Sequence, residues 1–186
     1  TNLIHIAPHL AAGLTERLRR RPRTEMHVVV IACENVYDNT RYLEEMILNN
    51  LNDENRDLVK DLVSFPCCMV DRIVPTTPKE IAEKYPLAVA VEDFFQFVID
   101  GKGLKAQFPI LEGIEISNNL PAKLEQKLFT LNMLHGIVGY WGHLAGYEFV
   151  HDAINDKYIS DLARGALTEV SEVIIKRNPI ISATEQ

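Results

Sequence analysis

The chain has 186 residues, 47% of them hydrophobic, with a formal net charge of -7 and an isoelectric point near 5.4. This length suits one medium domain or two small ones. A broadly acidic surface argues against nucleic acid or an anionic membrane as the main partner. No apolar run reaches the roughly 18 residues that a membrane span needs. The three cysteines, Cys33, Cys67 and Cys68, do not suit a disulfide framework, so we expect a reducing, cytoplasmic location.

Helix and strand patterns alternate through the first part of the chain. Leu3 to Leu18 carries an apolar stripe at helical spacing. Met26 to Cys33 is an apolar run with three valines, which predicts a strand buried on both faces, as in a parallel α/β sheet. Glu34-Asn35 follows this strand directly. Helical patterns then cover Tyr37 to Leu51 and Glu54 to Leu62.

Short strand patterns follow, and the last third of the chain is helical. The predicted strands are Phe65 to Val74, Leu87 to Glu92, Phe94 to Ile99 and Gly113 to Ile116, with a loop from Thr76 to Pro86. The predicted helices are Ala122 to Trp141, Tyr147 to Ile154 and Ile159 to Lys176. We therefore expect α/β followed by all-α, with one domain at residues 1–118 and a second at 119–186.

Four polar residues are candidates for a catalytic site. Asn35 follows a predicted strand, and the carboxyl ends of parallel strands are where α/β folds build their sites. On the first helix of the second domain, Asn132 lies about 140° and His135 about 80° around the axis from Lys127. All three fit one broad face, and their apolar neighbours predict partial burial. A snorkelling lysine and an amide that bonds the backbone explain these residues equally well.

Metal ligation finds little support in the sequence. His135, His143 and His151 are eight residues apart, and the one histidine pair at i, i+4 spacing, His5 and His9, has no acidic residue between its members. The adjacent Cys67 and Cys68 would point to opposite faces of a strand. We expect packing from the cysteines and no metal in the site.

Residues 127–146, KLFTLNMLHGIVGYWGHLAG, resemble the Lys-x4-Asn-x2-His signature of the polyol-specific long-chain dehydrogenase/reductase family. The KLFTLN form is most similar to the mannitol-1-phosphate 5-dehydrogenase branch. IACEN at 31–35, MVDRIVP at 69–75 and VEDFFQFVID at 91–100 are similar to other family segments in the same order, with Phe97 where tryptophan is usual. The resemblance extends from about Ile6 to Arg177.

The resemblance implies the back part of a Rossmann-like dinucleotide-binding domain, followed by the start of a helical substrate domain. It implies NAD as cofactor and metal-independent chemistry, in which Lys127 is the general base. Asn35 and Asn132 would donate hydrogen bonds to the developing alkoxide, and His135 would hold a substrate hydroxyl. Asp71 would support the site, or else form a surface pair with the adjacent arginine.

The chain also departs from the family pattern. It lacks the glycine-rich fingerprint that seats the dinucleotide pyrophosphate, and it lacks the later helices of the substrate domain. It therefore resembles the middle of a longer enzyme, and we expect the 186-residue chain alone neither to bind NAD well nor to turn over. Leu124 stands where related mannitol dehydrogenases have a glutamate, which puts a proton-relay role for the nearby Glu125 in doubt. Lys102 and Lys105 either lie in a solvated loop or contact a sugar phosphate.

The reaction that the resemblance implies is the interconversion of mannitol 1-phosphate and fructose 6-phosphate with NAD. Alternatives within the family are oxidation of free mannitol and reduction of a hexuronate such as fructuronate or tagaturonate. An alternative of another class is a non-catalytic helical binding module. The partner expected is a small sugar alcohol or sugar phosphate, and the sequence leaves the oligomeric state open.

Overall fold

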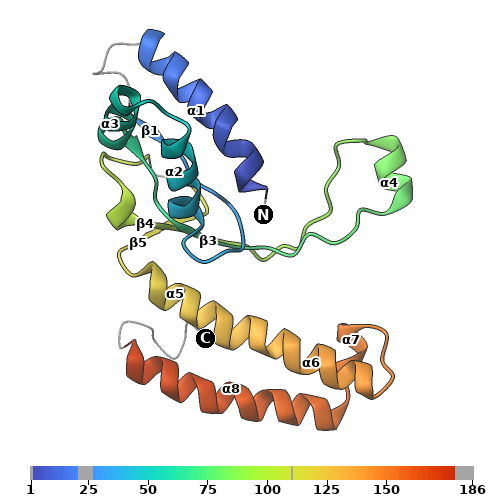
Figure 1. Ribbon diagram of the computed structural model, residues 1–186. Helices are drawn as coiled ribbons and strands as arrows, with labels where there is room; N and C mark the ends of the chain where they lie inside the picture. Colours follow the sequence, from blue (N-terminus) through green and yellow to red (C-terminus); the bar gives the residue numbers. More distant parts are fainter. Residues whose placement is uncertain (1, 21–26, 110, 179–186) are drawn as a thin grey trace. The chain divides into compact units, whose positions relative to one another are not determined.

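The computed structural model describes residues 2–20, 27–109 and 111–178 (Figure 1). The chain divides into two compact units, Thr1–Leu120 and Pro121–Gln186. The first unit mixes helices and strands and the second is helical.

Helices and strands alternate through the first unit. Its elements are α1 (Leu3–Arg20), β1 (Val28–Val29), α2 (Asn39–Asn49), α3 (Asp53–Leu62), β2 (Val63–Ser64), β3 (Cys68–Asp71), α4 (Lys79–Lys84), β4 (Gln96–Asp100), the 3₁₀ turn η2 (Gly101–Gly103) and β5 (Ile114–Ser117). β1 pairs parallel with β2. β4 lies between β3 and β5, antiparallel to β3 and parallel to β5. The helices α1, α2 and α3 follow the predicted helical segments closely.

The strand predicted from Met26 to Cys33 is much shorter in the structure. Its hydrogen-bonded part is Val28–Val29, which the amide of Val30 extends by donating to the Ser64 carbonyl at 2.9 Å. Met26 lies outside the described residues. The valines are half-buried rather than buried on both faces, so the prediction of full burial was wrong.

Two further predictions fail between β3 and β4. The segment predicted as a loop from Thr76 to Pro86 contains helix α4, which Pro78 precedes with its fixed φ. The segment predicted as a strand from Leu87 to Glu92 has no strand, because Leu87 is 95% exposed and its neighbours bond to a side chain instead. The hydroxyl of Thr77 donates to the Ala88 carbonyl and accepts from the Ala90 amide.

The core of the first unit lies between α1, α2, α3 and the paired strands β1 and β2. The buried side of α1 carries Leu3, Ala7, Ala11 and Leu14, whereas Ile6 is 43% exposed. The apolar stripe in the sequence therefore located both the helix and most of its buried face, because Leu10 and Leu18 also pack against this core. The two alanines let α1 pack closely against α2.

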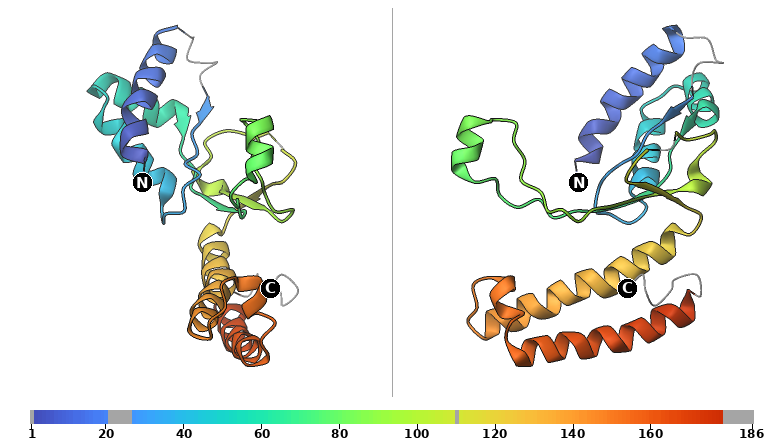
Figure 2. Two further views of the ribbon diagram at one scale, coloured as in Figure 1. Left: turned by 90° about the vertical axis from the view of Figure 1, so that its right-hand side faces the viewer. Right: turned by 180° about the vertical axis from the view of Figure 1, so that it is seen from behind.

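The second unit is a helical hairpin. Its elements are α5 (Leu120–Lys127), the π-helical turn η3 (Leu128–Asn132), α6 (Met133–Leu144), α7 (Val150–Ala153) and α8 (Lys157–Arg177). α6 and α8 pack side by side (Figures 1 and 2) around Val138, Ile159 and Ala163. Gly142 is buried, and a Cβ there would come within 2.6 Å of the Ala153 Cβ, so glycine permits the close packing of α7 on α6.

A buried amide joins the segment that follows β1 to β3. The Asn39 Nδ2 donates to the carbonyl oxygens of Glu34 and Cys68, each at 2.9 Å. Its Oδ1 accepts from the amides of Thr40 at 2.8 Å and Cys68 at 3.2 Å. The Thr40 hydroxyl accepts from the Ala32 amide at 3.0 Å. Side chains therefore satisfy backbone groups that the short strand leaves unpaired.

Replacing Asn39 by alanine should destabilise the first unit by about 2–4 kcal/mol, because buried groups of Thr40 and Cys68 lose their partners. Urea unfolding followed by circular dichroism measures the loss. Asn49→Ala, at the exposed end of the same helix, is the matched control and should change stability by no more than about 0.5 kcal/mol. Equal effects of the two substitutions would contradict the structural role of Asn39.

Candidate active site

Lys127, Asn132 and His135 lie on the long helix that α5, η3 and α6 form together. Lys127 ends α5, Asn132 ends η3, and His135 lies in the first turn of α6. Lys127 is half-buried, as predicted, whereas Asn132 and His135 are exposed. The prediction of partial burial was therefore wrong for these two residues, because the helix packs on α8 through a different face.

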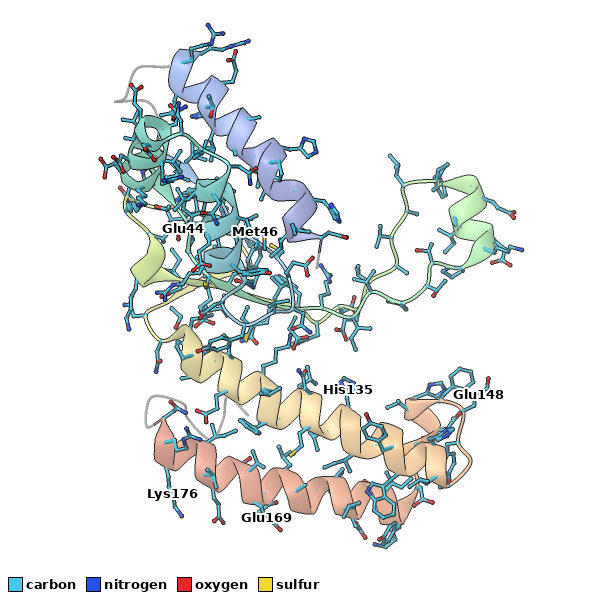
Figure 3. All side chains as sticks on the ribbon, viewed as in Figure 1. Glu44, Met46, His135, Glu148, Glu169 and Lys176 are labelled. Carbon is cyan, nitrogen blue, oxygen red and sulfur yellow. The ribbon has the colours of Figure 1, made fainter. Side chains whose placement is uncertain are left out.

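His135 lies at the edge of an apolar cavity within the second unit. The side chain projects from α6 on the side away from α8 (Figure 3). The cavity has a volume of about 460 Å³ and lies against α6 and α7. Its lining residues are Leu131, Leu134, His135, Val138, Phe149, Val150, His151 and Ile154. Apart from the two histidines the lining is apolar, so His135 is one of few side chains there that could bond a polar ligand.

A π-helical turn interrupts the helix between Lys127 and His135, which the sequence pattern did not predict. The amide of Met133 donates to the carbonyls of Leu128, five residues back, and Thr130, where an α-helix would use the residue four back. π-turns inside α-helices are rare and occur frequently at functional sites. The hydroxyl of Thr130 donates to the Gln126 carbonyl at 2.7 Å beside this turn.

Asn35 and Asp71 belong to the first unit. Asn35 is exposed in the segment between β1 and α2, directly after the Glu34 carbonyl that Asn39 holds. Asp71 is half-buried at the end of β3, the strand whose first residue, Cys68, bonds the same Asn39 side chain. The buried Asn39 side chain thus fixes the backbone of the segment that contains Asn35 and of the strand that contains Asp71.

The alternative role predicted for Asp71 is a surface pair with its neighbour Arg72. The Arg72 guanidinium donates to the Glu92 carbonyl from Nε at 3.1 Å and from Nη2 at 3.0 Å. It also lies 5.1 Å from the centre of the Phe95 ring. These contacts direct Arg72 toward the segment that precedes β4.

Two other charged residues have structural partners. The Lys105 ammonium donates to the carbonyl oxygens of Lys60 and, at 2.6 Å, Val63, at the carboxyl end of α3, where a cation suits the helix dipole. The Glu125 carboxylate pairs with Arg177 at 2.7 Å and accepts from Asn178 at 2.9 Å, which joins α5 to the end of α8. These contacts favour structural roles for both residues.

Cys67 and Cys68 pack in the interior, as expected. Cys67 and Cys68 are buried and Cys33 is exposed. The Cys68 thiol donates to the Ala32 carbonyl at 3.3 Å. Burial, together with the nearby Cys33, raises the pKa of Cys68 to about 12.

Within residues 2–20, 27–109 and 111–178, no three His, Cys, Asp or Glu side chains gather as metal ligands would. Over the same residues, no helix has the length and apolar character that crossing a membrane requires.

Two family models match the chain in succession. Residues 2–113 match the mannitol dehydrogenase Rossmann domain, and residues 119–185 match the mannitol dehydrogenase C-terminal domain. The chain belongs to the mannitol dehydrogenase family. This confirms the polyol dehydrogenase resemblance and the predicted fold class, a Rossmann-type domain followed by a helical one.

Solved structures agree with this fold. The chain is 26% identical to a D-sorbitol dehydrogenase solved in substrate-free form, with a TM-score of 0.74 over 90% of this chain and 39% of that one. It is 24% identical to Pseudomonas fluorescens mannitol 2-dehydrogenase in a ternary complex with NAD and D-mannitol, with a TM-score of 0.62 over 95% of this chain and 43% of that one. The second likeness shows the fold alone. The chain thus spans about two fifths of the length of these structures.

The cysteine environments predict selective alkylation. At pH 8 a thiol with a pKa of about 12 is ionised to roughly one part in ten thousand, so iodoacetamide should label the exposed Cys33 and leave Cys68 unmodified in the folded chain. Peptide mass spectrometry after timed labelling measures this, and labelling in urea is the control in which all three cysteines should react. Labelling of native Cys68 as fast as Cys33 would refute its buried, protonated state.

Proposed function

We propose that this chain carries the reacting residues of an NAD-dependent polyol dehydrogenase. Residues 1–118 would be the back part of its dinucleotide-binding domain, and residues 119–186 the first part of its helical substrate domain. The observation that supports this most directly is Lys127, Asn132 and His135 on one helix, within a chain of the mannitol dehydrogenase family.

Each residue has a role that its chemistry permits. Lys127 acts as general base and takes the proton of the substrate hydroxyl, the role that the family signature implies for it. Asn132 and Asn35 donate amide hydrogens to the oxygen on which negative charge develops. His135 bonds a second hydroxyl of the substrate, and Asp71 supports the site. None of these steps needs a metal.

The cofactor is NAD, which supplies the hydride acceptor when it is bound. The residues that would seat its pyrophosphate are not assigned, because the sequence has no Gly-x-Gly-x2-Gly motif. Gly103, in the one Gly-x-Gly of the chain, has a packing reason of its own. A Cβ there would come within 2.6 Å of the Pro66 Cα.

The substrate that KLFTLN favours is mannitol 1-phosphate, which exchanges with fructose 6-phosphate. Free polyols are the second candidate, because the two similar solved structures are named for sorbitol and mannitol. The engagement of Lys105 with α3 also leaves it a poor phosphate ligand, whereas Lys102 is exposed. A hexuronate is the third candidate substrate, and a non-catalytic binding module is the competing function of a different class.

Lys127→Ala should lower kcat by roughly 100- to 10,000-fold, because the reaction loses its general base. The assay follows NADH absorbance in the longest natural polypeptide that contains this chain. Lys123→Ala is the matched control, since Lys123 lies one turn earlier on the same helix and is also half-buried. It should keep most of the activity. Full activity of a folded Lys127→Ala protein would exclude the proposed base and indicate that the reaction uses a different site.

Substrate choice is tested separately with the unsubstituted polypeptide. We expect a higher kcat/KM for mannitol 1-phosphate than for mannitol, sorbitol or fructuronate, measured with NAD or NADH as the direction requires. Equal or greater kcat/KM for a free polyol would reject the phosphate substrate while leaving the general-base role of Lys127 intact.

A further inference from the structure

The π-turn η3 changes which side of the helix each candidate catalytic residue occupies. Residues joined by an α-helical hydrogen bond are four apart and lie nearly above one another. In a π-turn the bonded residues are five apart, so the turn accommodates one additional residue. Lys127 and Asn132 are five apart and lie at the two ends of η3.

This additional residue brings the three polar positions together. In an uninterrupted α-helix they would lie at about 0°, 140° and 80° around the axis, a spread of about 140°. Because η3 accommodates one additional residue, Asn132 and His135 have the angular positions around the axis that the fourth and seventh residues after Lys127 would have in an α-helix. Those places lie at about 40° and -20°, a spread of about 60°. The π-turn therefore converts a broad face into a narrow one that a single substrate can span.

Thr130 lies in the middle of this turn. In an α-helix the Gln126 carbonyl would accept from the Thr130 amide, but a π-turn moves the amide bonds one residue along. The Thr130 hydroxyl donates to that carbonyl at 2.7 Å. A threonine side chain that bonds the carbonyl four residues back competes with the α-helical register and stabilises a local departure from it.

A second threonine provides the comparison. The Thr168 hydroxyl donates to the Arg164 carbonyl at 2.9 Å, again four residues back, but α8 is α-helical there. The bond alone therefore does not produce a π-turn. Its effect on register is expected where an additional residue must be accommodated, as at Thr130.

We propose that Thr130 is a positioning residue, whose hydroxyl stabilises the π-turn that aligns Lys127, Asn132 and His135 on one narrow face. The inference rests on the proposed function, because that function gives the three aligned residues their roles. Loss of the hydroxyl shifts the turn toward the α-helical register and rotates Asn132 and His135 away from Lys127. Substrate then still binds, but the base and the amide donor no longer act on the same oxygen.

The test compares Thr130→Val, which removes the hydroxyl at nearly constant shape, with Thr130→Ser, which keeps it. In the longest natural polypeptide that contains this chain, Thr130→Val should lower kcat roughly 10- to 100-fold, the scale of a small misplacement of catalytic groups. The KM for NAD should stay within about twofold, because the turn lies outside the dinucleotide-binding domain. Thr130→Ser should restore most of the lost kcat. A purely structural role would instead lower the amount of folded protein and leave kcat per folded molecule unchanged.

Thr168→Val is the matched control, since it removes the same kind of bond from a regular helix. It should leave kcat unchanged. If Thr130→Val does not fold, Thr130→Ala applies the same test. Unchanged kcat in the folded hydroxyl-free variant, an equal loss in Thr168→Val, or no rescue by serine would each overturn the positioning role. Inactive Lys127→Ala beside fully active Thr130→Val would reject this inference alone, whereas active Lys127→Ala would reject the proposed function.

Discussion

Four backbone groups depend on the buried side chain of Asn39. Its amide nitrogen holds the carbonyls of Glu34 and Cys68, and its oxygen holds the amides of Thr40 and Cys68. β1 is two residues long and cannot fix the backbone that follows it. The amide therefore sets the place of the segment that contains Asn35 and the start of the strand that ends at Asp71. Breaking buried hydrogen bonds is costly, and three of these four are buried, which gives this connection its rigidity.

The second unit uses a comparable device on a helix. A side-chain donor, the Thr130 hydroxyl, bonds a backbone carbonyl where the regular hydrogen-bond pattern changes. Contacts with α8 hold this helix in place. α6 packs on α8 along its length, and the Glu125 contacts with Arg177 and Asn178 hold its first turns to the far end of α8. Reacting groups held on such a helix keep their geometry better than groups on a loop.

Hydrophobic periodicity predicted the long helices and the change from α/β to all-α near residue 118, because those features depend on many side chains at once. It did not predict α4, which buries no residue. Motifs placed Lys127, Asn132 and His135 on one helix. Asn39 and Thr130 were not found, because each acts through one or a few hydrogen bonds to backbone, and no periodic pattern records such bonds.

The spacing of the polar residues in the sequence does indicate the π-turn, but not when every residue is assumed to rotate by the 100° of a regular α-helix. Three polar side chains that contact one small substrate should share a narrow face, yet Lys127, Asn132 and His135 have the spacing i, i+5, i+8. The spacing that gives a narrow face in an α-helix is i, i+4, i+7. The difference is one residue, and it arises between the lysine and the asparagine, where η3 lies. Polar residues that share a narrow face only when one residue is subtracted from their spacing therefore indicate a π-turn between them. A threonine between the lysine and the asparagine is then a candidate for the side chain that stabilises the π-turn.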